Sequence, residues 1–139
     1  MKRRLQRLNL EQVTEEAIQE TAEDYLELNR EQLYQGKTSM GQELLPTYRS
    51  EVYAQMKNDM NPAPGLGIPD LKLTGAFYQG LSLEIQAGQI QEESDVEYAG
   101  KLFEKYDDIV GLDEVKLDEY RAGPFKEALE EKIKQVVYG

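Results

Sequence analysis

The chain has 139 residues and a mass of 15.9 kDa, enough for one domain with a modest core. It is 40% hydrophobic and 31% charged, so we expect it to fold and to be soluble. It contains no cysteine, histidine or tryptophan, which excludes disulfides, Cys/His zinc sites and histidine-based catalytic triads. Apolar runs are only two or three residues long, as at 136–138, so neither a membrane span nor a secretory signal is predicted.

Charge is distributed unevenly along the chain. The 27 acidic and 16 basic residues give a net charge of −11. The first eight residues hold four positive charges and no acid, so the other 131 residues carry −15. We therefore predict a basic N-terminal arm over residues 1–8, followed by a single α+β domain over residues 9–139. A body this acidic repels phosphate, so specific DNA binding is not expected. The basic residues of the arm are Lys2, Arg3, Arg4 and Arg7.

The first half of the domain is predicted to be mainly helical. Apolar residues recur every three or four positions over 9–34, which predicts one long amphipathic helix. The glycine-bounded segment 36–41 is expected to turn as the tip of a loose hairpin. A second helix is predicted from the apolar repeat that follows, with Thr47 as its cap and Asn61-Pro62 as its end. That repeat consists of Tyr48, Val52, Tyr53, Met56 and Met60.

A loop and a hairpin are predicted next. Residues 61–70 hold three prolines and two glycines, which is typical of a loop. A short helix is expected around residues 76–78. Alternating apolar residues over 81–85 predict a half-buried strand, and a turn at Ala87-Gly88 leads to a return strand over 89–93.

The C-terminal third is predicted to be helical again. A capping box at 94–97 precedes a helix that starts at 95 or 98 and ends at 107, and another helix is expected over 113–121. Gly123 and Pro124 are interpreted as the end of one helix and the start of the last. The predicted fold is thus α+β, a small antiparallel β-hairpin packed with a long N-terminal helix and C-terminal helices. The predicted core consists of Phe77, Leu81, Leu83, Phe103, Phe125 and Leu129.

No residue pattern predicts catalysis, a cofactor or a metal. The densest acidic cluster could hold a hard cation through oxygen ligands, but its spacing does not fit an EF-hand, and we interpret it as a solvated helix end. Gly65-Leu66-Gly67 and Gly36-Lys37-Thr38 both lack the further glycines and the context of nucleotide-binding loops. We therefore do not expect an enzyme. The acidic cluster consists of Asp107, Asp108, Asp113 and Glu114.

Several short motifs occur in a recognisable order over roughly residues 70–135. Residues 73–77, Leu-Thr-Gly-Ala-Phe, precede the strand, Val-Glu-Tyr-Ala follows at 96–99, and Gly-Pro-Phe at 123–125 opens the last helix. This order resembles the small neck proteins of tailed bacteriophages, called head–tail joining, tail-completion or tail-terminator proteins. Phe77, Gly123 and Lys126 depart from the usual pattern. The first half is more loosely similar to prophage proteins of gut bacteria, through residues 32–36, 46–48 and 61–75.

The resemblance implies a structural virion protein at the neck or tail, made in the bacterial host cytoplasm. Its partners would be further copies of itself in a homo-oligomeric ring and neighbouring portal, connector or tail proteins. DNA would pass nearby without specific binding. The expected contacts are the arm, the proline-rich loop and two exposed tyrosines: Lys2, Arg3, Arg4, Arg7, Tyr34, Pro62, Pro64, Pro69 and Tyr138.

Two alternatives follow from the residues themselves. An acidic cytoplasmic protein that mimics DNA, or otherwise binds a basic partner, would share the negative charge and the lack of a catalytic set. The second alternative is a small hydrolase that uses carboxylates and a divalent metal.

Overall fold

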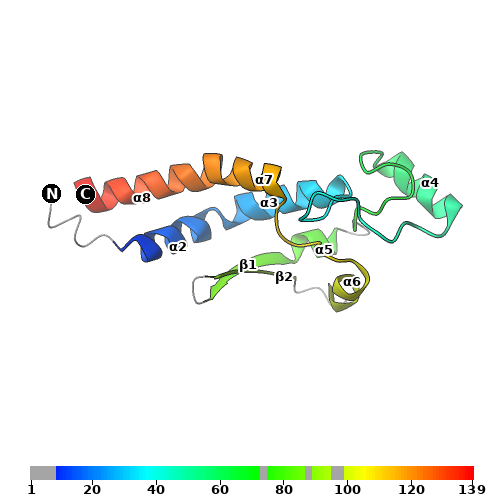
Figure 1. Cartoon of the computed structure of the whole chain (residues 1–139), viewed down its shortest axis with the longest axis horizontal. Helices are drawn as coiled ribbons and strands as arrows, with labels where there is room; N and C mark the ends of the chain where they lie inside the picture. The colour runs from blue at the N-terminus through cyan, green and yellow to red at the C-terminus, as the bar shows by residue number, and fades with distance from the viewer. Residues whose placement is uncertain (1–8, 73–74, 87–88, 95–98) are drawn as a thin grey trace.

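The computed structural model describes residues 9–72, 75–86, 89–94 and 99–139, which form an elongated body (Figure 1). Two successive helices run along its length, and the last helices lie beside them. A two-stranded hairpin lies below, and one short helix forms the far end (Figure 1). The predicted α+β class is confirmed. The elements are α2 (Leu10–Glu20), α3 (Ala22–Tyr34), α4 (Glu51–Met60), α5 (Ala76–Gln79), β1 (Leu81–Gln86), β2 (Gln89–Ser94), α6 (Ala99–Lys105), α7 (Glu114–Tyr120), the π-helical segment η1 (Arg121–Phe125) and α8 (Lys126–Tyr138).

The predicted single helix over 9–34 is wrong at Thr21, where α2 ends and α3 begins. The Thr21 hydroxyl donates to the carbonyl of Ala17 at 2.7 Å and pairs with the Tyr120 hydroxyl, also at 2.7 Å. A threonine that bonds back to the preceding turn bends a helix, and here α7 supplies the second partner. The break therefore depends on a residue 99 positions away in the sequence.

Helix α4 begins later than predicted and turns its apolar repeat outward. Its N-cap is Ser50, whose hydroxyl accepts a hydrogen bond from the Tyr53 amide, so the prediction of Thr47 as the cap is wrong. The residues of α4 that are buried are Ala54 and Lys57. The helix ends at the predicted Asn61-Pro62.

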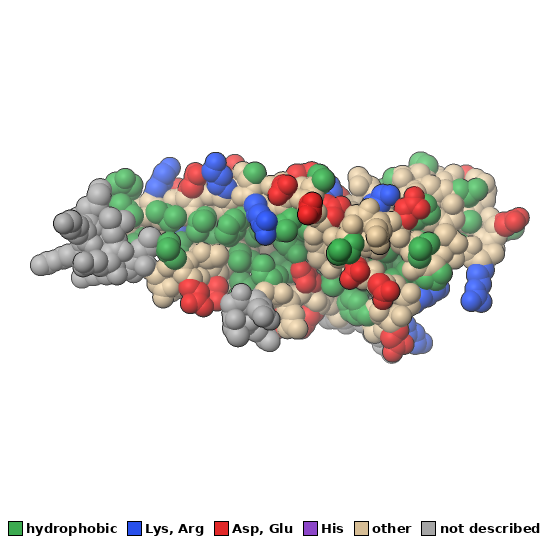
Figure 2. Space-filling view, in the orientation of Figure 1, with side chains coloured by type: hydrophobic (Ala, Val, Ile, Leu, Met, Phe, Trp, Pro, Cys, Tyr) green, Lys and Arg blue, Asp and Glu red, His purple; other side chains and the backbone are tan. Residues whose placement is uncertain are grey.

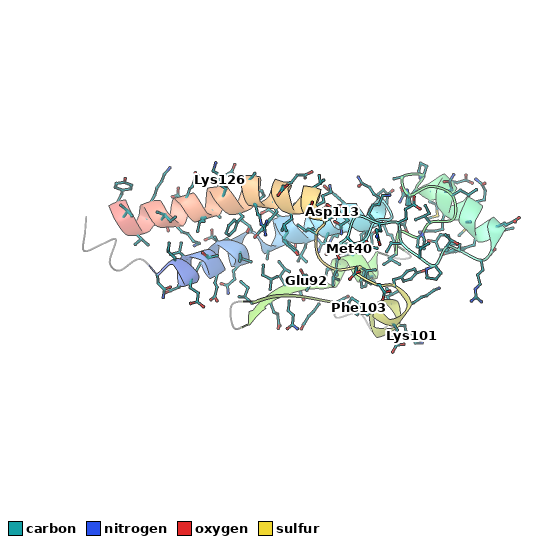
Figure 3. All side chains as sticks on the ribbon, in the orientation of Figure 1. Met40, Glu92, Lys101, Phe103, Asp113 and Lys126 are labelled. Carbon is teal, nitrogen blue, oxygen red and sulfur yellow. The ribbon has the colours of Figure 1, made fainter. Side chains whose placement is uncertain are left out.

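The hairpin agrees with the predicted alternation. Strands β1 and β2 pair antiparallel, with Leu83 opposite Glu92 and Ile85 opposite Ile90. Leu81 is buried, and Leu83 and Ile85 are half-buried. Glu92 lies on β2 beneath α3 (Figure 3), where it accepts a hydrogen bond of 2.6 Å from the Tyr25 hydroxyl. The hairpin thus contacts α3 through apolar side chains and through the hydrogen bond between Tyr25 and Glu92.

The C-terminal helices are continuous through Gly123 and Pro124, so the predicted end and restart there are wrong. Segment η1 carries Pro124 inside a π-helical turn between α7 and α8. Proline lacks an amide hydrogen and its ring collides with the preceding turn, and the wider π turn accommodates both. Helix α7 starts after Asp113, whose carboxylate accepts from the Lys116 amide at 2.9 Å.

Two clusters of buried side chains form the core. The larger contains Leu26, Leu33, Phe77 and Leu81, and the smaller joins Tyr25 to Tyr120. Leu83 packs partly buried on both clusters, Phe125 packs on the smaller one, and Leu129 is half-buried on α8. The core prediction is wrong for Phe103, which contacts the Phe77 ring at its edge and is 38% exposed on α6 (Figure 3).

Two buried amides clamp the loop before α7 onto α3. Asn29 donates to the carbonyl of Ile109 and accepts from the Gly111 amide. Gln32 donates to the carbonyl of Gly111 at 2.8 Å and accepts from the Asp113 amide at 2.8 Å. Because each amide both donates and accepts a hydrogen bond to this loop, the two side chains fix the start of the C-terminal helices relative to α3.

Candidate functional site

The proline-rich loop is anchored at both ends. Asn61 and Asp70 are buried, whereas Pro62 is exposed and Pro64 is half-buried. Pro69 is fully buried inside the chain. The prediction of Pro69 as a contact residue is therefore wrong, and only the middle of the loop is accessible to a partner.

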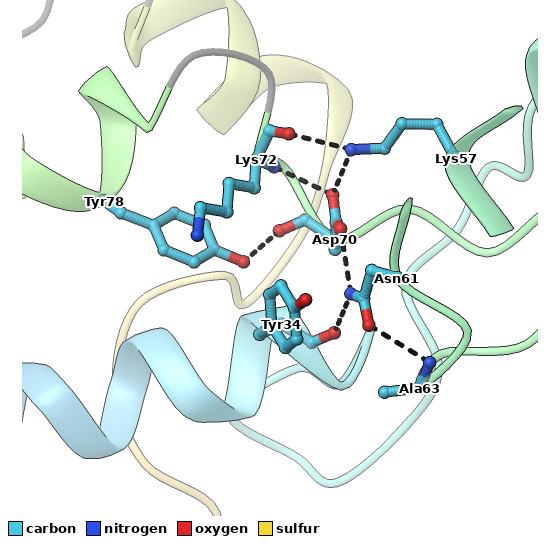
Figure 4. Close-up of polar contacts among 7 residues, drawn as sticks. All are labelled: Tyr34, Lys57, Asn61, Ala63, Asp70, Lys72 and Tyr78. Carbon is cyan, nitrogen blue, oxygen red and sulfur yellow. Dashed lines mark hydrogen bonds and ion pairs between the residues drawn. The ribbon is translucent and has the colours of Figure 1, made fainter. Parts of the chain in front are cut away.

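A buried ion pair holds this loop between α3 and α4 (Figure 4). The Lys57 ammonium lies 2.8 Å from the Asp70 carboxylate and donates to the carbonyl of Lys72 at 2.8 Å. Asn61 donates to the other carboxylate oxygen at 3.0 Å and to the carbonyl of Tyr34 at 2.7 Å. Each charge thus has an opposite charge and a hydrogen-bond partner, which buried ions require.

Tyr78 extends this network toward α5. Its hydroxyl donates to the Asp70 carbonyl (Figure 4). Burial, and then the negative charge of Asp70, raise the pKa of the Tyr78 phenol above its ordinary value of 10.0. The phenol is therefore a neutral hydrogen-bond donor at physiological pH.

A cleft of about 650 Å³ opens beside this network, lined by α3 on one side and by Lys72, Gly75, Tyr78 and Gln79 on the other. The Lys72 ammonium lies 5.3 Å from the centre of the Tyr34 ring, and 5.8 Å from that of Tyr78. Arg30 pairs with Glu23 and Glu27 and donates to the Tyr78 carbonyl. Both cations that line the cleft are thus engaged by its own aromatic, acidic and backbone groups.

The acidic cluster predicted as a solvated helix end is dispersed over a loop and a helix start. Asp107 and Asp108 are exposed, Asp113 caps α7, and Glu114 is exposed in its first turn. Across the described parts of the chain, no group of three or more acidic side chains is arranged to hold a metal ion. In the same residues, no helix has the length and hydropathy to cross a bilayer.

Helix α4 lies at one end of the body (Figure 1) and exposes an apolar stripe to solvent. Val52, Met56 and Met60 follow one another at intervals of four and are 81%, 47% and 64% exposed. Residues at this spacing lie on one side of a helix. We call Val52, Met56 and Met60 the α4 stripe.

The opposite end of the body also exposes apolar side chains. Helix α2 begins and α8 ends there (Figure 1), and Leu10 and Tyr138 are 62% and 71% exposed. Tyr138 is thus accessible, as its predicted contact role requires. Tyr34, at the end of α3, lines the cleft and is also exposed. Lys2, Arg3, Arg4 and Arg7 lie outside the described residues.

The sequence analysis missed the Lys57–Asp70 pair and the exposure of the α4 stripe. The sequence of this short helix gave no sign that Lys57 is buried, because its partner Asp70 is 13 residues away at the far end of the loop. For the stripe, the signal was present: the repeat at 52, 56 and 60 and that at 54 and 57 occupy different sides of one helix.

Comparisons with protein-family models, with curated proteins and with solved structures found no match to this chain.

Proposed function

We propose that the chain is a non-enzymatic structural subunit of a tailed phage or prophage that acts at the head–tail junction as part of a homo-oligomeric ring. The observation that carries the proposal is the pair of exposed apolar surfaces at opposite ends of an elongated body. These surfaces are the α4 stripe at one end, and Leu10 and Tyr138 at the other.

Two different apolar surfaces at opposite ends favour head-to-tail contact between copies. Such heterologous contacts generate rings when the rotation between neighbours closes. Apolar side chains that are this exposed are common at protein–protein interfaces. Strong negative charge suits a ring with a DNA-filled lumen, because the wall repels phosphate. The ordered motifs that resemble neck proteins support the same role.

The direct test is the native mass of the full chain and of end-blocked variants, measured by light scattering during gel filtration. The wild-type chain should form a closed oligomer. Met56→Glu should stop growth at the α4 end, and Tyr138→Glu at the other. The matched control is Gln55→Glu, which also introduces a glutamate at an exposed position of α4, outside the stripe. It should leave the oligomer intact.

Mixing the two blocked variants distinguishes the kind of contact. In a head-to-tail contact each variant keeps the surface that the other has lost, so the mixture should contain dimers while each variant alone stays monomeric. Pairing of Tyr138→Glu with itself would instead mean a symmetric contact through α4. A wild-type monomer that does not assemble would remove the self-assembling ring and leave the acidic binding protein as the alternative.

A further inference from the structure

A shallow groove runs between α2 and the hairpin. Two adjoining hollows of about 240 Å³ and 310 Å³ share Ile18 on α2 and Ile85 on β1. Figure 2 shows hydrophobic side chains along this join. The hairpin therefore covers α2 incompletely, and apolar surface remains open to solvent along their contact.

The groove combines an apolar floor with an acidic border. Its floor includes Leu10, Ile18, Ile85 and Ile90, and Ile90 is 36% exposed. Glu11 and Glu15 of α2 line the same hollow. An occupant that fits must offer aliphatic side chains to the floor and positive charge to the border.

The basic arm has that composition. Residues 2–8 read Lys-Arg-Arg-Leu-Gln-Arg-Leu, so Leu5 and Leu8 are interspersed with four positive charges and no acid. The two leucines match the floor, and the lysine and arginines match the glutamates. Burial of the two leucines would favour docking and oppose the entropic cost of ordering the segment.

The arm also joins the domain at the groove itself. Asn9, the N-cap of α2, is followed directly by Leu10, which lines one hollow. Leu5 precedes Asn9 by four residues, a reach of up to about 14 Å when extended. Ile18 lies about 12 Å along α2 from Leu10 at 1.5 Å per residue. An arm that turns back at Asn9 can therefore place Leu5 on the floor of its own groove.

We propose that the groove between α2 and the hairpin is the docking site of this chain's own basic arm, with Leu5 and Leu8 on the apolar floor and the basic side chains toward Glu11 and Glu15. Covalent connection keeps the arm at high effective concentration beside its site, which favours its own groove over that of another copy. The docked arm would complete the cover over the hairpin, whether or not copies associate.

A single tryptophan reports on docking, because the chain has none of its own. Leu5→Trp in the full chain should emit at shorter wavelength and be quenched by acrylamide several-fold less than Gln6→Trp, the neighbouring control. Adding Ile90→Ser to Leu5→Trp should return the emission toward that of the control. Equal quenching of Leu5→Trp and Gln6→Trp would overturn the proposal.

Cysteine cross-linking tells which copy's arm is bound, because the chain also lacks cysteine. The Leu5→Cys/Ile90→Cys double variant should oxidise to an internally bridged monomer, and a mixture of the two single variants should give no dimer. A covalent dimer in the mixture of single variants, together with no internal bridge in the double variant, would show that copies exchange arms. That is the contact role expected from the sequence, and it would overturn docking within the chain. Absence of both products would overturn it as well.

Discussion

Lys57 and Asp70 are the charged side chains whose loss should cost the molecule most. Lys57→Met removes the positive charge and keeps an unbranched side chain of nearly the same length, so the Asp70 carboxylate stays buried without its counter-ion. Breaking a buried pair in this way costs about 3–5 kcal/mol. We expect a fall of about 3 kcal/mol in the free energy of unfolding, measured by urea denaturation followed by circular dichroism.

Lys126→Met provides the matched control for this change. Lys126 forms a pair of 4.0 Å with Glu130 on the exposed surface of α8 (Figure 3), where such pairs contribute less than about 1 kcal/mol. Similar losses for Lys57→Met and Lys126→Met would mean that the buried pair does not stabilise the fold.

Tyr25 should make the free energy of unfolding fall as the pH becomes alkaline. Burial, and then the hydrogen bond to Glu92, raise the pKa of its phenol in the folded state above the ordinary value of 10.0. The unfolded chain therefore loses this proton first as pH rises, so the stabilisation is complete below about pH 10 and declines above it. The free energy of unfolding of Tyr25→Phe, measured by urea denaturation, should decline less than that of the wild type between about pH 8 and 10.5. Equal declines would contradict this role of Tyr25.

At the scale of elements, Thr21 is the joint between α2, α3 and α7. Thr21→Val keeps the shape and removes the hydroxyl that bonds to Ala17 and Tyr120. The buried Tyr120 hydroxyl then loses its partner, at a cost of about 1–3 kcal/mol in the free energy of unfolding. Thr14→Val, on the half-buried side of α2, should change the thermal midpoint much less. A midpoint unchanged by Thr21→Val would mean that the joint does not depend on this hydroxyl.

The elements that could be predicted from the sequence are those whose signal is local. Alternation over 81–85 located β1, and the short helix expected around residues 76–78 corresponds to α5. The joint at Thr21 could not be predicted, because it depends on Tyr120 across the fold. The prediction of a break at Gly123 and Pro124 followed from local preferences and failed because the π-helical turn over Arg121–Phe125 accommodates Pro124 and carries the helix from α7 into α8.

The candidate site was less predictable than the fold. The residue types carry no pattern that predicts catalysis, and assembly is predicted only through the resemblance to neck proteins. Tyr138, a predicted contact residue, is exposed. Pro69 was misassigned because a proline-rich segment carries no local sign of which proline is buried. The sequence groups the residues of the α4 stripe on one side of the helix, but only the burial of Ala54 and Lys57 in the structure shows that this side faces solvent.

For the whole molecule, a net charge of −11 makes copies repel one another. Contact through apolar ends should therefore strengthen as salt screens this repulsion. We expect the concentration at which oligomers dissociate to fall several-fold between about 0.05 M and 0.5 M NaCl, measured by light scattering. Association that weakens with salt would instead indicate contacts between opposite charges.

The chain returns to the end of the body from which its first described helix starts, since α2 begins where α8 ends (Figure 1). A reporter protein fused after residue 139 or before residue 9 would therefore occupy the same end, next to Leu10 and Tyr138. Circular permutation could move both chain ends to the exposed Met40–Gly41 peptide without cutting a helix or strand. A reporter fused to the permuted chain would therefore lie at Met40–Gly41 and leave the end that carries Leu10 and Tyr138 uncovered.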